Sequence, residues 1–335
     1  MTAVGVFLMG VGGIGSLVAK LLLQDSRFAL RGAADTDAAK SGRDLGDLLQ
    51  MGKLGIEVAS RPLEALEASD AQVVIHATTS FLPRAFPEVM ACVQRGKHVV
   101  STCEELAYPW ARYPELASQL DQEAKAHGVR VLGGGVNPGM VMDLLPIILA
   151  ANVGKITHVK VRRVVDLAGR RPQLQRKAGL GLTPEEFQVR LQERAIGHVG
   201  LLESAHLIAS ALGWHLQEVR EQMTPLLAPR PMRHGAYRLS PGQVAGFRQE
   251  LVGIAGDEPV LRMELVMALE PPDAMDAIEI EGSARVRAIF LGGIPGDVAT
   301  ASLMLQWAWV VACYPGPMGL MTVRDLPLWP RQMGG

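Results

Sequence analysis

Four glycines stand within six positions near the start of the chain, where an apolar run gives way to a helical pattern. Residues 3–10, AVGVFLMG, form a continuous apolar run, which is typical of a parallel strand buried on both faces. From Ile14 to Leu22 the apolar residues recur at helical spacing. A turn between strand and helix ordinarily needs one glycine, so the additional ones indicate that another group comes close to the backbone.

The glycines follow the spacing G-x-G-x-x-G, at Gly10, Gly12 and Gly15. In this pattern the first glycine permits a tight turn, the second lets a pyrophosphate approach the backbone, and the third lets the helix lie close to the strand. The helix N-terminus offers N–H groups to the phosphates. A glycine-rich turn without a ligand is the alternative. The pattern predicts a dinucleotide site formed by Gly10, Gly12, Gly13, Ile14 and Gly15.

A second expected strand, FALRGAAD, ends in Asp35, at the distance from the glycines where a partner of the ribose 2′-hydroxyl is expected. A carboxylate there favours NAD because it repels a 2′-phosphate. Lys40 and Arg43 follow closely and could pair with such a phosphate, or could simply be solvated. The sequence therefore predicts NAD or NADP, with a slight preference for NAD.

Further apolar runs at residues 70–80, 96–105 and 128–139 indicate more buried strands, each ending in polar or glycine-rich sequence. Because ligands gather outside the carboxyl ends of parallel strands, these ends should converge on one site. We therefore predict an α/β fold whose N-terminal part is a Rossmann-type, doubly wound parallel sheet. The residues expected at the cofactor, besides those of the glycine turn, are Thr78, Thr79, Ser80 and Asn137.

Glu104 and Glu105 end the second of these runs, at residues 96–105. If the substrate carbon carries an amine, a carboxylate can both hold the ammonium group and relay its proton. Two adjacent glutamates repel each other when both are buried, so one should face the cleft while the other is solvated or paired. Glu104 is slightly favoured as the catalytic member. The alternative is that both simply begin a helix and interact with its dipole.

After Asp143 the pattern changes to alternating strands at residues 155–166, 258–270 and 276–290, with helices expected after Thr183 and near residues 198–214. We predict three segments: a nucleotide-binding domain at 1–140, an α+β domain with a mostly open sheet at 141–298, and a segment at 299–335 that packs back on the first domain. An open sheet face is often closed by a second copy, so a homodimer is expected.

Six short motifs in this order resemble the 2,4-diaminopentanoate dehydrogenase family. This family includes the native amine dehydrogenases and lies near the dihydrodipicolinate reductase-like enzymes. The resemblance covers nearly the whole chain, and its motifs are STCEELAYPW, GGGVNPGMVMDLLP, RRPQLQRKAGLGLTPEEF, GHVGLLESAHLIASALGW, PGQVAGFRQE and GGIPGDVATA.

The resemblance implies NAD(P)-dependent oxidative deamination of an amine or, in reverse, reductive amination of a ketone or aldehyde with ammonia. It also implies that one glutamate of the EE pair is catalytic, and that Asn137, Pro138 and Gly139 line the nicotinamide pocket. Asn137 could contact the cofactor or the substrate, or could serve only the turn before Pro138. The rival activities are 2,4-diaminopentanoate oxidation and dihydrodipicolinate reductase-like C=N reduction. A third alternative is an NAD(P)-sensing protein without catalytic activity.

Met140 and Trp110 flank the two motifs nearest the nicotinamide and are bulky and apolar, although either could belong to the core. They favour a small hydrophobic amine over a diamino acid. Arg162 could hold a polar substrate tail or lie in solvent. His198 could face the substrate or cap a helix. The expected substrate-binding set is thus Asn137, Pro138, Met140, Trp110, Arg162 and His198.

The composition points away from several other classes of protein. The net charge of −1 does not favour nucleic acid or an anionic membrane as a partner. The apolar segment ATASLMLQWAWVVACYPG is short and contains Gln306, so a buried helix is expected there. Three widely spaced cysteines suit a reducing cytoplasm, and neither metal-ligand spacing nor a signal peptide is expected.

Overall fold

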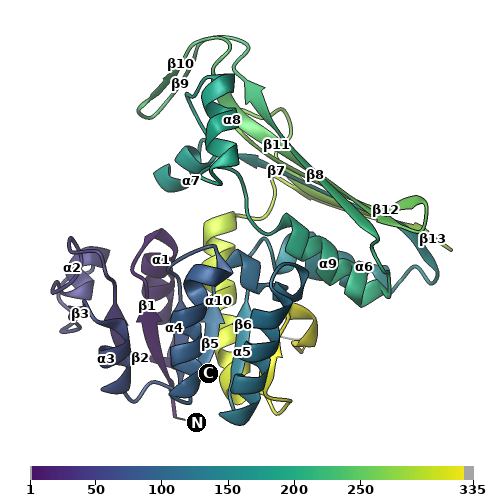
Figure 1. Cartoon of the computed structure of the whole chain (residues 1–335). Coiled ribbons are helices and arrows are strands. Elements are labelled where there is room, and N and C mark those ends of the chain that lie inside the picture. Colours follow the sequence, from purple (N-terminus) through teal and green to yellow (C-terminus); the bar gives the residue numbers. More distant parts are fainter. Residues whose placement is uncertain (1, 328–335) are drawn as a thin grey trace. The chain divides into compact units, whose positions relative to one another are not determined.

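The computed structural model describes residues 2–327, which form two compact units. The first unit combines Met1–Met140 with Pro295–Gly335, and the second is Val141–Ile294. Each unit has its own large sheet (Figure 1). Residues 328–335 of the C-terminal segment predicted at 299–335 lie outside the described residues.

The first unit contains a seven-stranded sheet in the order β15-β6-β5-β4-β1-β2-β3, and every pair of neighbours is parallel. Strands β1, β4 and β6 are buried along their whole length, which explains their continuous apolar sequence. The predicted doubly wound parallel sheet is confirmed. Its strands are β1 (Val4–Met9), β2 (Phe28–Ala34), β3 (Val58–Ala59), β4 (Val73–His76), β5 (His98–Ser101), β6 (Arg130–Gly133) and β15 (Gly319–Met321).

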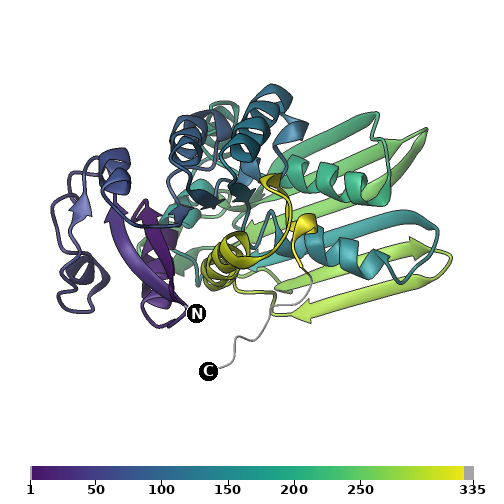
Figure 2. The same cartoon turned by 90° about the horizontal axis from the view of Figure 1, so that it is seen from below.

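Helices cover both faces of this sheet (Figure 2). On one side α10 contacts α1, β4, β5 and β6, and on the other side α4 and α5 pack together against β5 and β6. The helix α10 is the buried helix expected from its apolar sequence, and no described helix is both long and apolar enough to cross a membrane. The helices are α1 (Gly13–Leu22), α2 (Leu45–Leu49), α3 (Pro62–Glu67), α4 (Leu82–Gln94), α5 (Pro114–Ala126) and α10 (Gly296–Cys313).

The chain order of the sheet reverses between β1 and β4. From β1 the chain proceeds to β2 and β3 on one side, and from β4 it proceeds to β5 and β6 on the other. In open α/β sheets the crevice outside the carboxyl ends of such a pair is where ligands bind. The glycine turn after β1 and the loop after β4 therefore lie on either side of this crevice.

The segment YPGPMGLMTVRD is rich in glycine and proline, yet it contains β15, which pairs in parallel with β6. The buried guanidinium of Arg130 holds the preceding turn. It donates to the carbonyls of Val311 (2.8 Å), Gly316 (2.6 Å) and Pro317 (3.0 Å). The strand is missed by sequence inspection because its three residues are stabilised by this distant side chain and not by local propensity.

The second unit is built on a six-stranded sheet in the order β14-β13-β7-β12-β11-β8, in which only β7 and β12 are parallel neighbours. Residues 276–290 were predicted to form one strand but form a hairpin, and β8 and β11 were not predicted. The strands of this sheet are β7 (Ile156–Asp166), β8 (Glu218–Leu227), β11 (Val244–Ala255), β12 (Glu258–Ala268), β13 (Met275–Gly282) and β14 (Arg285–Leu291). Strands β9 (Met232–His234) and β10 (Tyr237–Leu239) form a separate two-stranded antiparallel sheet.

The helices α6 (Leu145–Ala150) and α9 (Leu201–Leu212) lie along one face of the second sheet (Figure 1). The short helix α7 spans Pro172–Lys177, and α8 (Pro184–Gln192) begins with the predicted cap. Thr183 Oγ1 accepts the N–H of Glu186 (3.2 Å), whose carboxylate accepts the N–H of Thr183 (2.8 Å). The predicted α+β unit with an open sheet is confirmed.

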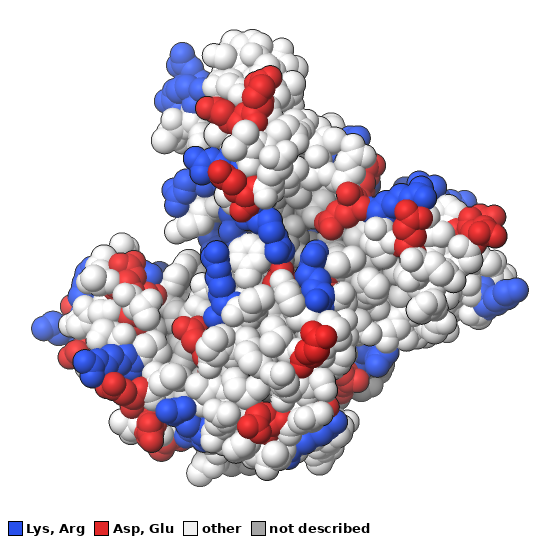
Figure 3. Space-filling view, viewed as in Figure 1, with Lys and Arg blue, Asp and Glu red and all other residues white. Residues whose placement is uncertain are grey.

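The other face of this sheet carries exposed charged side chains beside apolar ones, and we call it the open face. In the first unit, Lys or Arg and Asp or Glu side chains are interspersed over the surface visible in Figure 3. The residues of the open face include Lys160, Arg162, Val164, Arg248, Glu250, Arg262, Glu264, Val266, Ala277, Ile289 and Leu291.

Candidate active site

The glycine turn between β1 and α1 has a different steric requirement at each of its three glycines. Gly10 has a φ of 97°, and a Cβ on it would lie 2.6 Å from the carbonyl oxygen of Ala77, which follows β4. A Cβ on Gly15 would overlap the carbonyl oxygen of Gly10. A Cβ on Gly12 would have no neighbour within 4 Å. The turn is therefore tight at Gly10, closely packed at Gly15 and open at Gly12, which fits the approach of a pyrophosphate.

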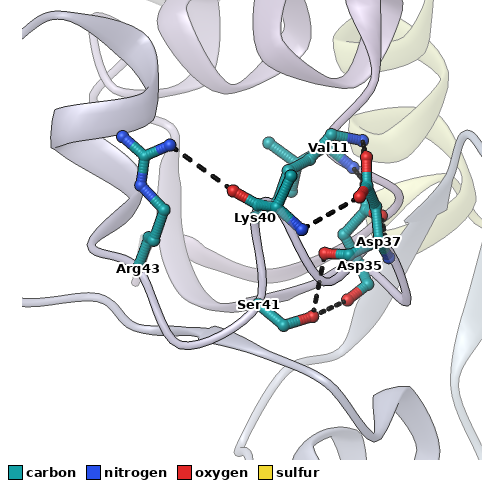
Figure 4. A network of polar contacts seen from close by, with 7 residues as sticks. Val11, Asp35, Asp37, Lys40, Ser41 and Arg43 are labelled. Carbon is teal, nitrogen blue, oxygen red and sulfur yellow. Dashed lines mark hydrogen bonds and ion pairs between the residues drawn. The ribbon is translucent and has the colours of Figure 1, made fainter.

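Asp35, directly after β2, is joined to the glycine turn by hydrogen bonds (Figure 4). Its Oδ2 accepts the backbone N–H of Val11 (2.8 Å) and a bond from Lys40 Nζ (2.9 Å), while Oδ1 accepts the N–H of Asp37 (2.9 Å). The guanidinium of Arg43 instead donates to the carbonyl of Ala39 (3.4 Å). Of the two predicted phosphate-binding cations, the structure places Lys40 beside the expected ribose site.

Asp35 and Lys40 keep each other charged. Burial alone would raise the pKa of Asp35, but the hydrogen bonds from Lys40, Asp37 and Val11 outweigh burial and lower this pKa below its usual value. Burial would lower the pKa of Lys40, but the carboxylates of Asp35 and Asp37 outweigh it and raise the pKa. The site thus presents a carboxylate suited to ribose hydroxyls next to an ammonium group suited to a phosphate.

The loop after β4 holds the predicted residues Thr78, Thr79 and Ser80, and hydrogen bonds join it to its surroundings. Thr78 Oγ1 lies 2.9 Å from His76 Nε2, at the end of β4. Thr79 Oγ1 accepts a backbone N–H within the loop (3.3 Å). The carbonyl of Ser80 accepts the N–H of Glu105 (3.3 Å). The loops after β4 and β5 therefore contact each other at the crevice.

The two adjacent glutamates differ in environment. Glu105 is fully buried, and its Oε2 accepts the N–H of Leu82, the first residue of α4 (2.8 Å). The hydroxyl of Tyr113 lies 3.5 Å from its Oε1. A carboxylate at a helix N-terminus is stabilised by the helix dipole. Glu104 is only half-buried, so it is the member of the pair that solvent reaches.

The sequence GGGVNPG forms a tight loop after β6 that rests on α10. The N–H of Gly135 donates to the carbonyl of Pro138 (2.7 Å), and the N–H of Val136 donates to Thr300 Oγ1 (3.1 Å). Asn137 is half-buried and precedes Pro138 through a cis peptide bond. Sequence inspection missed Thr300, because this residue of α10 meets the loop from 164 positions away and no local pattern marks it.

The two predicted bulky residues are both half-buried. Trp110 stacks at a tilt against Tyr108, with ring centroids 5.3 Å apart and an interplanar angle of 55°. It also packs against the core formed around α4 and α5. Met140 is the first residue of the turn at Met140–Leu144. Trp110 therefore has a clear packing role in the first unit.

Two of the three polar residues predicted to contact the substrate, Arg162 and His198, belong to the second unit and are not brought together. Arg162 projects from the open face, where Nε lies 3.0 Å from Glu264 Oε2. His198 precedes α9, and its carbonyl accepts a bond from Gln249 Nε2 (3.1 Å), whose side chain is buried on the opposite face of the sheet. In residues 2–327 no three His, Cys, Asp or Glu side chains are placed to hold a metal ion.

Comparisons with known proteins agree with this geometry. Residues 140–335 match the family described as 2,4-diaminopentanoate dehydrogenase C-terminal domain, and residues 4–103 match the N-terminus of dihydrodipicolinate reductase. The chain is 30% identical to the 2,4-diaminopentanoate dehydrogenase of Acetoanaerobium sticklandii, covering 100% of this chain and 96% of that protein.

Two amine dehydrogenases are also similar. The amine dehydrogenase of Streptomyces virginiae is 24% identical, with 96% of this chain and 95% of that protein covered. The solved structure of an amine dehydrogenase from Mycobacterium smegmatis has a TM-score of 0.86 and 26% identity, covering 97% and 96% of the two chains. The resemblance seen in the six sequence motifs is thereby confirmed, and the chain belongs to the 2,4-diaminopentanoate dehydrogenase family.

Proposed function

We propose that this protein is an NAD(P)-dependent amine dehydrogenase, an oxidoreductase acting on CH–NH2 groups. It would remove ammonia oxidatively from a primary amine and, in reverse, aminate a ketone or aldehyde. The observation that carries the proposal is the half-buried carboxylate of Glu104 at the same edge of the sheet as the glycine turn. One strand, β4, separates β5 from β1, so the two strand ends are about 10 Å apart.

The cofactor-binding residues proposed are those of the glycine turn, together with Asp35 and Lys40. NAD(P), when bound, supplies the hydride acceptor, and its reduced form supplies the hydride donor. The carboxylate of Asp35 supports NAD because it can accept from ribose hydroxyls. The ammonium of Lys40, 2.9 Å from this carboxylate, could turn toward a 2′-phosphate and would allow NADP as a second cofactor.

Glu104 is proposed to bind and deprotonate the substrate ammonium group. Deamination requires the amine nitrogen to lose its proton before the C–N bond gains double-bond character, and a nearby carboxylate can take that proton. The other glutamate is committed to the backbone of α4 through Leu82. We therefore assign catalysis to Glu104 and a supporting role to Glu105.

Paired glutamine variants test this assignment. Glu104→Gln keeps the size of the side chain but removes the base, so amine oxidation should fall by about a hundredfold or more while the NADH dissociation constant stays within about twofold. Glu105→Gln should lower the melting temperature more than Glu104→Gln does, because it weakens the bond to the Leu82 N–H. Full activity of Glu104→Gln, or loss of its NADH binding, would overturn the assignment.

The substrate class is proposed from the half-buried, apolar side chains of Trp110 and Met140, which favour a small hydrophobic amine or ketone. A diamino acid is the second candidate, because the relative from Acetoanaerobium sticklandii is named as a 2,4-diaminopentanoate dehydrogenase. Asn137 would be a polar contact for such a substrate, and a contact of His198 with it stays a separate proposal. Arg162 is paired with Glu264 on the open face, and this supports a place for it at a subunit contact.

The oxidative direction tests the function. NAD or NADP reduction is followed with a panel of small primary amines and with 2,4-diaminopentanoate, and released ammonia is measured alongside. Amine-dependent reduction with ammonia in equal amount is the expected result. Reduction of a cyclic imine substrate without any ammonia chemistry would favour the C=N reductase alternative instead.

We further propose a homodimer in which the open face of one copy meets that of a second. Exposed apolar side chains lie among charges there: Leu291 is 88% exposed and Ile289 is 43% exposed. Burying such a row against a second copy is favourable by the hydrophobic effect. The Arg162–Glu264 and Arg248–Glu264 ion pairs could satisfy the buried charges.

Sedimentation velocity of two matched variants tests the dimer. Ile289→Asp puts a charge on the open face and should produce monomers. Val189→Asp changes an exposed apolar residue of α8, which lies elsewhere on the second unit, and should leave the dimer intact. A monomeric wild type would contradict the proposal.

A cytoplasmic location is also proposed, since Cys92, Cys103 and Cys313 are free thiols.

A further inference from the structure

A network of four polar side chains at the strand ends is not used by the mechanism above; His76 and Ser101 are fully buried, Glu88 is partly exposed and Thr78 is exposed. Its centre is His76, the last residue of β4, which is fully buried. Nδ1 of this histidine lies 2.8 Å from Ser101 Oγ, at the end of β5. Nε2 lies 2.9 Å from Glu88 Oε2 on α4 and 2.9 Å from Thr78 Oγ1. One imidazole therefore joins two strand ends and a helix.

The donor and acceptor types fix the direction of the bond between His76 and Glu88. The carboxylate of Glu88 only accepts, so Nε2 must carry a hydrogen and donate it. Thr78 also donates to Glu88 Oε2 (3.0 Å). The bond from His76 is the main cause of a pKa of Glu88 below its ordinary value. Both ring nitrogens of His76 therefore have a polar partner.

The composition resembles a nucleophilic triad, but the burial excludes that use. Ser101 is fully buried, so its hydroxyl cannot reach a substrate. Its Oγ instead accepts the backbone N–H of Cys103 (3.1 Å), the residue just before Glu104. At the other end, the methyl group of Thr78 would lie 3.2 Å from a Cβ on Gly10. The network therefore runs from the backbone beside the glutamate to the glycine turn.

We propose that His76 is a positioning residue that fixes the cofactor loop after β4 and the glutamate loop after β5 relative to each other. This inference rests on the proposed function, because it assigns Glu104 to the amine. His76 and Ser101 are fully buried, so breaking the bond between them would leave buried polar atoms without a partner, and this cost holds the two strand ends in place. Both loops must keep a fixed spacing if a proton and a hydride are to leave the same substrate.

Two isosteric variants separate the ends of the network. In His76→Gln the amide nitrogen takes the place of Nε2, so the bonds to Glu88 and Thr78 survive and the bond to Ser101 is lost. In His76→Asn the amide takes the place of Nδ1, so the opposite end survives. The matched control is His98→Leu at the amino end of β5, where Nδ1 accepts the N–H of Arg130 (3.0 Å).

The expected results differ between the two ends. His76→Gln should reduce kcat about tenfold and leave the NADH dissociation constant within about twofold, whereas His76→Asn should weaken NADH binding about tenfold, as expected when one hydrogen bond to a charged group is lost. Hydrogen exchange should accelerate in residues 101–105 for His76→Gln and in residues 77–80 for His76→Asn. His98→Leu should lower the melting temperature and change neither quantity.

The inference is overturned if both His76 variants change kcat and NADH affinity together, or if their effects merely follow the melting temperature as for His98→Leu. Hydrogen exchange and NADH titration do not depend on amine turnover. A wild-type protein that binds NADH but oxidises no amine would therefore refute the proposed function, while these two measurements would still decide whether His76 positions the loops.

Discussion

Replacing Gly12 with alanine should separate folding from cofactor binding. The backbone at Gly12 is extended, with φ −81° and ψ −166°, so alanine can adopt it without strain. A methyl group there would meet no atom within 4 Å. It therefore occupies the open space through which a pyrophosphate would approach.

The effect on stability follows from two opposing terms. Reduced freedom of the unfolded chain stabilises by about 0.4–1 kcal/mol, and loss of the glycine preference at a helix N-cap costs up to about 1 kcal/mol. The net change should lie within about 1 kcal/mol of zero, a shift of a few degrees at most in melting temperature. Loss of one charge-assisted bond to phosphate, about 2 kcal/mol, weakens NADH binding by roughly thirtyfold.

Gly15→Ala is the contrasting variant, because its Cβ would overlap the carbonyl oxygen of Gly10. This overlap would force α1 away from the turn and should lower the free energy of unfolding by at least about 1–3 kcal/mol. Differential scanning fluorimetry gives the melting temperatures, and the fluorescence of NADH gives the dissociation constants. Wild-type NADH affinity in Gly12→Ala, or an equal fall in the melting temperature of both variants, would refute this reading of the glycine turn.

Variants at three further positions have expected outcomes. Lys40→Met should reduce affinity for NADPH more than for NADH, measured by titration with each. The same change should also move acid unfolding to higher pH. The pKa of Asp35 is lower in the folded protein than in the unfolded chain, so its carboxylate stabilises the fold above the unfolded pKa, and this stabilisation is lost as pH falls through the folded pKa. Lys40→Met removes one cause of the lowered pKa, so the loss should occur at higher pH. Arg130→Met should lower the midpoint of urea unfolding, because three carbonyls lose their buried donor, while Arg130→Lys should recover part of the loss. Asp276→Asn should lower the free energy of unfolding by about 3–5 kcal/mol, because it leaves the buried charge of Arg163 without its partner. Arg163 Nη1 lies 2.7 Å from Asp276 Oδ2, and both side chains are almost fully buried. An unchanged urea midpoint would show that this pair is not a stabilising contact.

The parallel sheet could be predicted because its strands are buried on both faces and their apolar runs are bounded by glycines. The second sheet was predicted less completely. Strand β8 has mostly half-buried or exposed residues, and β14 alternates exposed with half-buried side chains, so neither gives a clear apolar run. The short turn of Ser283 and Ala284 also hid the boundary between β13 and β14.

The candidate site shows the same limit. Sequence alone favoured Glu104 over Glu105 only slightly, because adjacent residues share one local pattern. Burial and the bond from Leu82 distinguish them in the structure. Thr300 and the His76 network depend on contacts between distant segments, and no spacing in the sequence reveals them.

The most direct test of the amine dehydrogenase proposal is the oxidation of NADH and NADPH by a panel of small ketones and aldehydes, measured with and without a large excess of ammonium at alkaline pH. We expect cofactor oxidation only when ammonium is present, with the corresponding primary amine as the product. Equal rates without ammonium, with an alcohol as the product, would identify a carbonyl reductase and contradict the account.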